Sequence, residues 1–452
     1  MAEMRTLNGF EVVDGKAREQ IAEERAQRQA DVARTMQAAE SAAEMANDIK
    51  PRALIRQIVI YDKDTKKNVN FEDVHAYFAV NAKSAGYMYA LEAHGTTSTT
   101  QRVYVSYDGG ETWEVKGTLT IDASSGKWFT DLFVDEGTNT MHLIKTTDGF
   151  TMEHNQLCSF IWNGESWWQS GTLELGAKRW LSNNNSIDVC TNADWSKRVM
   201  IFGEYGTTKD GSTYALYKST NSGSAWTKVL ELGGNSNGAE YTGEIRHWHT
   251  VQVDPYTLHW WASTGDGDPQ CRIYRSTDDG DTWELMFSGS QRERLCSFVF
   301  EKDCIYYGMD STNNWDEQSV KIVKIDKSKL ETDRANARED VAVVDSAFAV
   351  YGLSKVWFPE GFIVWSQREV GSFLKDRYIL QFYDYATKKM YPIARFDISD
   401  VAETNFVGFP AGARYQSRFS GVVIARPSPY LHQSKYNTHG NTSTHLKINV
   451  TC

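Results

Sequence analysis

The stretch that decides the fold is Ser276-Thr277-Asp278-Asp279-Gly280-Asp281-Thr282-Trp283. Its residues are typical of a tight turn between two strands. Asp278 is placed to accept hydrogen bonds from backbone amides of its own turn, and Gly280 permits a positive φ where a Cβ would clash. Trp283 begins the next strand with a large apolar side chain. The stretch therefore predicts a tight β-hairpin.

The same pattern recurs along the chain. A full copy occupies residues 106–113, a weaker one residues 219–226, and an eroded one, which keeps only Gly-x-Ser-Trp, residues 160–167. Successive copies begin 54, 59 and 57 residues apart. A period of this length indicates a repeat architecture, and a blade of four strands is the favoured unit. The residues expected to hold these turns are Asp108, Gly110, Trp113, Asn221, Gly223, Trp226, Asp278, Gly280 and Trp283.

The pattern S-x-D-x-G-x-T-W resembles the Asp-box, or bacterial neuraminidase repeat, of sialidase-like β-propellers. In that family the box forms the turn between the third and fourth strands of a blade, away from the active-site face. The resemblance therefore implies an all-β propeller and a structural role for the box, and it says little about activity. Seven blades are favoured, and six is the alternative if residues 54–71 form a neck. The candidate innermost strands begin near His75, Trp128, Asn184, His247, Leu295, Phe348 and Tyr415.

Both ends of the chain are expected to build the last blade. Residues 54–71 share a Tyr-Asp-x-x-Thr-Lys-Lys core with residues 383–389, which predicts an outer hairpin with strands 54–61 and 68–71. Its inner strands would come from residues 416–426 and 445–450, so that no sheet edge stays open. The chain would then enter a third strand from the face that carries the second-to-third strand loops. This direction favours the opposite face as the receptor surface.

Residues 1–51 differ in composition from the rest of the chain. They are rich in Ala, Glu, Gln and Arg, and apolar residues three or four apart form a narrow stripe on a predicted helix. Such a stripe is stable only against other copies or another protein; a helix lying on the propeller wall is the alternative. Within residues 6–18, the stretch Leu7-Asn8-Gly9-Phe10 and an Asp-x-x-Ala-Arg step at residues 14–18 precede the predicted helix. In these motifs the segment resembles the start of phage tail-fibre and baseplate proteins. That resemblance implies a virion-attachment segment, usually trimeric, in front of a receptor-binding module.

Composition excludes several classes of function. The net charge of -11 and the lack of any Lys/Arg-rich block argue against a nucleic-acid partner. The six cysteines have no metal-type spacing, so buried thiols and no metal site are expected. No run approaches the roughly 18 apolar residues of a membrane span, and no signal peptide is expected. The buried thiols favour folding in a reducing compartment. The resemblance to phage tail proteins implies assembly in the cytoplasm of a bacterial host, followed by residence in the virion tail.

Three arginines stand at the start of candidate innermost strands: Arg246, Arg294 and Arg414. If they converge, they would resemble the carboxylate clamp of sialidases, because planar guanidinium groups bind a carboxylate through two hydrogen bonds. Tyr415 and Glu244 would then be the nucleophile and base. The Arg-Ile-Pro signature of that family is missing, however, and no Asp stands out as the acid. Solvated or salt-bridged arginines at the propeller rim are therefore the alternative.

Other polar residues extend the candidate glycan-binding set. His247 and His249 lie on one face of a predicted strand, but no third metal ligand is identifiable, and core or rim histidines are the alternative to a metal site. Asp266 and Asp268 belong to a predicted second-to-third strand loop that suits sugar hydroxyls, with Ca²⁺ as a weaker alternative and no other cofactor expected. A plain turn is the alternative for this loop. Trp315 has polar neighbours and suits stacking on a sugar ring, with a Trp that caps the blade wall as the alternative.

Two functions follow from these patterns. The favoured one is a non-enzymatic phage tail receptor-binding protein, a homotrimer that docks onto other tail or baseplate proteins through residues 1–51. Its propeller, residues 52–452, would recognise a bacterial surface polysaccharide. The alternative is a sialidase-like glycoside hydrolase or depolymerase that acts on an acidic surface glycan.

Overall fold

The computed structural model divides the chain into two compact units, Met1–Arg52 with Cys452, and Ala53–Thr451. It describes residues 5–7, 10–12, 54–61, 76–77, 82–83, 88–92, 97–107, 114–135, 137–146, 155–175, 179–180, 186–191, 198–206, 213–234, 243–311, 320–344, 348–354, 361–368, 376–397, 407–408, 422–427 and 445–451. In the first unit, β1 (Arg5–Leu7) and β2 (Phe10–Val12) form an antiparallel hairpin. The helix expected after Val12 lies outside the described residues.

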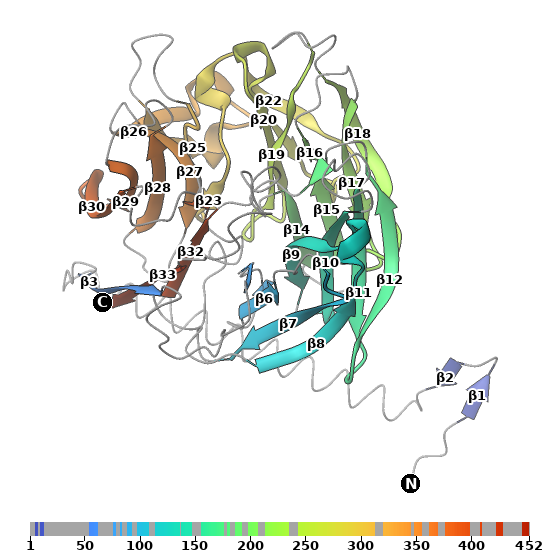
Figure 1. Cartoon of the computed structure of the whole chain (residues 1–452). Coiled ribbons are helices and arrows are strands. Elements are labelled where there is room, and N and C mark those ends of the chain that lie inside the picture. The colour runs from blue at the N-terminus through green and yellow to red at the C-terminus, as the bar shows by residue number, and fades with distance from the viewer. Residues whose placement is uncertain are drawn as a thin grey trace. The chain divides into compact units, whose positions relative to one another are not determined.

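The second unit is all-β in its described part and consists mainly of four-stranded antiparallel sheets, which Figure 1 shows one after another in chain order. The first sheet contains β4 (Ala76–Tyr77), β6 (Met88–Glu92), β7 (Thr100–Ser106) and β8 (Glu114–Thr120). The second contains β9 (Phe129–Asp135), β10 (Thr140–Thr146), β11 (Asn155–Trp162) and β12 (Trp167–Glu174), with β5 (Ala82–Lys83) added parallel to β9. The third contains β14 (Ile187–Thr191), β15 (Arg198–Gly203), β17 (Thr213–Ser219) and β18 (Thr227–Gly233).

Three more sheets repeat the same meander. The fourth contains β19 (His247–Val253), β20 (Trp260–Gly265), β21 (Arg272–Ser276) and β22 (Glu284–Ser288). The fifth contains β23 (Phe298–Phe300), β24 (Cys304–Gly308), β25 (Lys321–Asp326) and β26 (Arg338–Val343). The sixth contains β27 (Phe348–Ser354), β28 (Gly361–Arg368), β29 (Asp376–Asp384) and β30 (Lys389–Asp397).

Short elements connect these sheets. A two-stranded pair joins β13 (Arg179–Trp180) to β16 (Tyr205–Gly206). Single 3₁₀ turns are η1 (Ala123–Ser125), η3 (Asp268–Gln270), η4 (Gln291–Glu293), η5 (Lys327–Lys329) and η6 (Arg334–Asn336). Within the described residues, no helix is long and apolar enough to cross a membrane.

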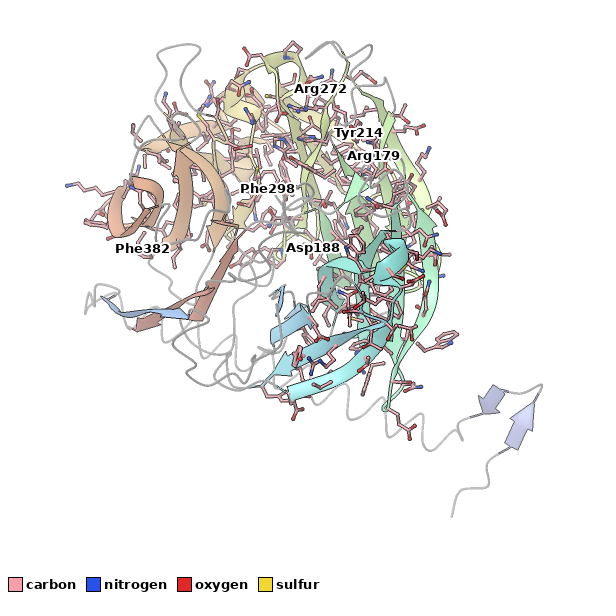
Figure 2. The ribbon with its side chains drawn as sticks, in the orientation of Figure 1. Arg179, Asp188, Tyr214, Arg272, Phe298 and Phe382 are labelled. Carbon is pink, nitrogen blue, oxygen red and sulfur yellow. The ribbon has the colours of Figure 1, made fainter. Side chains whose placement is uncertain are left out.

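Consecutive sheets pack face to face through apolar cores, because successive strand residues point to opposite faces. In β20, Trp260 and Ala262 belong to the core shared with the third sheet, whereas Trp261 between them belongs to the core shared with the fifth. The Trp261 ring lies 6.1 Å from that of Phe298 in β23, which Figure 2 labels. Sheets that are apolar on both faces and follow one another in this way form a β-propeller.

The closing sheet joins the two ends of the second unit. It consists of β31 (Val407–Gly408), β32 (Val422–Pro427) and β33 (His445–Thr451), with β3 (Leu54–Tyr61) on the outer side of β33. The strands β3 and β33 are antiparallel, with Leu54 opposite Thr451. Three strands therefore come from the C-terminal part of the chain and one from the N-terminal part.

Two details of the expected closure are wrong. Residues 54–61 form the fourth strand and not the third, because β3 pairs with β33, which is itself the third. The chain therefore enters this sheet where the other sheets have their third-to-fourth strand turns, at the end opposite to the one expected. The first strand of the sheet is β31, before the expected start at Tyr415. Tyr415 and residues 68–71 lie outside the described residues.

The turn at residues 276–283 has the expected geometry and joins the third and fourth strands of its sheet. Asp278 Oδ1 accepts the Thr282 backbone N–H at 2.9 Å and the Ser276 hydroxyl at 2.8 Å. Gly280 has a φ of 85°, and the Trp283 indole N–H donates to the Gly280 carbonyl oxygen at 3.1 Å. The aspartate and the glycine thus hold the turn that the motif predicted.

The other copies preserve parts of this geometry. In the weaker copy, Asn221 Oδ1 accepts the Ala225 N–H at 2.9 Å, and Gly223 has a φ of 81°. Trp226 packs at the core between the second and third sheets. In the eroded copy, Asn163 Oδ1 takes the aspartate's place and accepts the Ser166 N–H at 2.8 Å. The residues Asp108, Gly110 and Trp113 of the remaining copy lie outside the described residues.

Candidate functional site

Four chain segments meet at the end of the propeller opposite to these turns. They are the start of β19, the loop from β20 to η3, the segment between η4 and β23, and the residues that follow β24. In each sheet the first strand begins and the second strand ends on this side. The residues that flank these strand ends in neighbouring sheets therefore lie close together. The buried polar group found there is called the His–Asp cluster, and it consists of Arg246, His247, His249, Asp266, Arg294, Cys296 and Asp310.

Asp266 is the hub of the cluster and is only 8% exposed. Its Oδ2 accepts a hydrogen bond from Arg246 Nη1, and its Oδ1 lies 3.2 Å from Arg294 Nη2. The same Oδ1 lies 3.3 Å from His249 Nε2. Burial alone raises the pKa of Asp266, but the Arg294 guanidinium outweighs it and holds the pKa well below its usual range. Asp266 is therefore an ionised carboxylate that pairs with both arginines.

The two histidines of β19 face each other inside the cluster. Their Nε2 atoms are 3.0 Å apart, and each Nδ1 lies beside a backbone carbonyl oxygen, that of Gly206 at 2.6 Å and that of Leu295 at 3.2 Å. His249 is the extra residue of a β-bulge, where the pairing with β20 skips one position, and a bulge re-aims the side chain it carries. The period of two predicted both rings on one face, and the bulge at His249, which the sequence did not predict, sets the direction of the second ring.

The environment keeps His247 neutral. Burial lowers the pKa of His247 to about 3, and the Tyr205 ring stacks on its imidazole with ring centroids 3.9 Å apart. A neutral imidazole that donates from Nδ1 carries its lone pair on Nε2. With its proton on Nδ1, beside the Gly206 carbonyl oxygen, His247 has its Nε2 lone pair on the side of the cluster.

Cys296 and Asp310 extend the cluster toward the fifth sheet. The Cys296 thiol donates to Asp310 Oδ2 at 3.2 Å, and Arg294 Nε lies 3.4 Å from the same oxygen. Burial, and then the Asp310 charge, raise the pKa of Cys296 well above its usual range. Because only a thiolate is a strong nucleophile, Cys296 acts here as a buried hydrogen-bond donor.

The fold brings together four of the candidate residues, Arg246, His247, Asp266 and Arg294, but not all of them. Glu244 lies apart, since its Oε2 accepts the Gly233 N–H at 2.9 Å and its Oε1 lies 3.8 Å from Arg272 Nη1 (Figure 2 labels Arg272). Asp268 is exposed, and its Oδ1 accepts the Gln291 side-chain amide at 2.8 Å. The remaining candidates, Trp315, Arg414 and Tyr415, lie outside the described residues.

Sequence reasoning missed Cys296 and Asp310. Asp310 follows β24 as Asp266 follows β20, so both acids come after the second strand of neighbouring sheets. A search for acidic residues at the ends of second strands would have found the pair. Cys296 gave no such signal, because a lone cysteine before a strand is usually a small buried apolar residue.

Other buried charges connect strands and sheets elsewhere in the propeller. Asp188 Oδ2 accepts the Val253 N–H at 2.9 Å, which joins β14 to β19. The Arg179 guanidinium lies 3.8 Å from the centroid of the Tyr214 ring, and Figure 2 labels all three side chains Asp188, Arg179 and Tyr214. Each of these contacts gives one buried charged side chain a partner. The His–Asp cluster differs because several titratable side chains contact one another there.

No family model matches this sequence, and no curated protein matches it. Among solved structures, a prolyl endopeptidase is 11% identical with a TM-score of 0.46, over 100% of this chain and 59% of its own. The GH74 xyloglucanase from Xanthomonas campestris is 14% identical with a TM-score of 0.48, over 82% of this chain and 54% of its own. The β-propeller domain of the Trilobed protease from Pyrococcus furiosus is 11% identical with a TM-score of 0.42, over 78% of this chain and 91% of its own. This chain thus spans 59% and 54% of the two enzymes, and similarities this distant carry no inference about its activity.

Proposed function

We propose that this chain is a receptor-binding protein of a phage tail. In this proposal it is a homotrimer joined to other tail or baseplate proteins through residues 1–51, and its seven-bladed propeller binds a bacterial surface polysaccharide without cleaving it. The observation that carries the proposal is the position of β3. The chain enters the closing sheet at the third-to-fourth turn end. Attachment there leaves the opposite end, with its loops and the His–Asp cluster, available to a receptor.

The chemistry of that end supports glycan recognition. Arg246 and Arg294 are each about one-fifth exposed, and Asp268 is exposed on the same loop as Asp266. Guanidinium and carboxylate groups at the rim of a propeller suit the hydroxyl and acidic groups of a polysaccharide. Trp315, Arg414 and Tyr415 remain candidates for the same surface, whereas His247 is only 2% exposed.

A binding screen on capsular and cell-wall polysaccharides tests this function. We expect saturable binding to one class of polysaccharide, no release of reducing sugar, and a solution mass of three chains. Asp268→Ala should weaken binding, whereas the matched exposed variant Asp303→Ala, in the β23–β24 hairpin at the other end, should not. A monomeric full-length chain would refute the attachment role, and equal binding by the two variants would move the receptor site elsewhere.

A second candidate is a sialidase-like hydrolase of acidic glycans. It is favoured by one observation, the convergence of Arg246 and Arg294 on a single carboxylate. The carboxylate is that of Asp266, so a substrate would have to displace it. The hydrolase predicts release of reducing sugar or sialic acid by the native chain and loss of that release in Arg246→Ala. Binding without release decides for the receptor-binding protein.

A further inference from the structure

We propose that His247, His249 and Asp266 bind one divalent transition-metal ion of the zinc class, with a fourth coordination position left for water. Neither the sequence pattern nor the proposed glycan recognition requires this site. The third ligand, which the sequence did not reveal, is supplied by the loop after β20. It lies nineteen and seventeen positions from the two histidines, yet the fold places all three donor atoms within 4.8 Å of one another.

The three donor atoms have the spacing that such an ion needs. His247 Nε2 and His249 Nε2 are 3.0 Å apart, and Asp266 Oδ1 lies 3.8 Å from the first and 3.3 Å from the second. Atoms separated by these distances can all lie about 2.0–2.1 Å from one point, which is the usual length of a zinc bond to nitrogen or oxygen. The ligands are also well fixed, because both histidines and Asp266 are less than a tenth exposed.

The outer contacts of the histidines are those of metal ligands. Each Nδ1 lies beside a backbone carbonyl oxygen, that of Gly206 or Leu295, so a proton on Nδ1 leaves the Nε2 lone pair free for a metal ion. The two Nε2 atoms face each other at 3.0 Å. When both lone pairs are free they repel each other, and a cation between them removes the repulsion. Because the donors are two imidazole nitrogens and one carboxylate oxygen, zinc fits better than calcium or magnesium, which prefer oxygen ligands alone.

A shared proton is the competing explanation. A proton on His249 Nε2, donated to His247 Nε2, would also relieve the repulsion without adding charge, and the Leu295 carbonyl oxygen would keep the Ser263 hydroxyl as its donor at 2.8 Å. The guanidinium groups of Arg246 and Arg294 weaken the attraction for a dication, because they already balance the negative charges of Asp266 and Asp310. We therefore expect an exchangeable ion, which a chelator removes without unfolding the propeller.

Cobalt provides the direct probe, since Co²⁺ occupies zinc sites and its visible absorption reports coordination number. Full-length protein is treated with a chelator, dialysed and titrated with Co²⁺. We expect saturation at one ion per chain, the intense absorption of a low-coordinate site, and its loss on adding Zn²⁺. In crystals of the zinc-loaded protein, anomalous scattering should place the ion between the two Nε2 atoms. Absence of saturable Co²⁺ uptake, or an ion located elsewhere, overturns the proposal in favour of the shared proton.

Variants assign the ligands. His247→Gln should lose the cobalt absorption, whereas His259→Gln should keep it, because His259 lies in the β19–β20 hairpin at the other end of the same strands. Equal cobalt binding by the two variants overturns the assignment. Circular dichroism checks that both fold, and if His247→Gln does not, the titration and the anomalous map of the native chain decide alone.

Discussion

At the scale of single residues, Asp278 makes the stability of its turn depend on pH. Burial alone raises its pKa, but hydrogen bonds from Thr282 and Ser276 outweigh it and lower the pKa to about 2. The ordinary value is about 3.9, so the unfolded chain binds this proton more tightly than the folded one. The stability that Asp278 contributes is therefore complete above about pH 4 and is lost as the pH falls toward 2.

Two variants test this turn. Asp278→Ala should lower the free energy of unfolding at pH 7 by about 1–2 kcal/mol, because it removes acceptors of the Thr282 and Ser276 hydrogen bonds. Asp278→Asn keeps an acceptor but does not titrate, so its deficit relative to the native chain should shrink below about pH 4. Urea unfolding at pH 7 and pH 3 measures both. A deficit of Asp278→Asn that is independent of pH would contradict the assignment.

Single residues also mark how far sequence reasoning reaches. The period of two places His247 and His249 on one face, and Arg246 and Arg294 flank strands whose positions the repeats determine. The partner of all four, Asp266, is found only when β20 and its loop are placed in three dimensions. A contact of this kind depends on packing between non-consecutive segments, which no local pattern encodes.

At the scale of elements, two of the third-to-fourth turns rest on the preceding sheet. A Cβ on Gly280 would lie 2.2 Å from Ile201 Cδ1 in β15, and a Cβ on Gly223 would lie 2.3 Å from Ser159 Oγ in β11. Asp281 in the first of these turns also pairs with Lys218 of β17 at 2.5 Å. The turns therefore help to hold neighbouring sheets in register.

This contact predicts a difference between two glycines with positive φ. Gly280→Ala should cost about 2–4 kcal/mol of unfolding free energy, through the left-handed backbone and the overlap with Ile201. Gly289→Ala, with a φ of 103° and open space around it, should cost only about 1 kcal/mol. Urea unfolding measures both variants. Equal losses of unfolding free energy in the two variants would mean that packing of the turn against β15 does not contribute to stability.

The repeats predicted element positions well where the turn motif or a clear strand pattern was present. Innermost strands expected near Trp128, His247 and Phe348 begin at residues 129, 247 and 348. The strand order of the closing sheet was predicted wrongly, because this sheet has no copy of the turn motif. Its fourth strand comes from the other end of the chain, so local spacing could not say whether residues 54–61 were the third strand or the fourth.

At the scale of the whole molecule, β3 makes the propeller depend on its N-terminal strand. In the described structure β3 covers the outer side of β33. Without β3, the backbone groups of β33 on that side would be an open sheet edge, which invites aggregation. The same strand directly follows residues 1–51 in the sequence, so the proposed attachment and the ring closure would share one stretch of chain. Two truncations separate these roles.

Removal of residues 1–52 keeps β3, and removal of residues 1–61 deletes it. The shorter truncation should abolish the proposed trimer but leave the melting temperature of the propeller unchanged. The longer one should lower it by about 5 °C or more, since each kcal/mol lost shifts the midpoint of a large domain by about 2–4 °C. A synthetic peptide of residues 53–62 should restore part of the loss by adding back the strand. Equal melting temperatures of the two truncated chains would show that β3 does not close the ring. They would also contradict the position proposed for the attachment segment, because that position depends on β3.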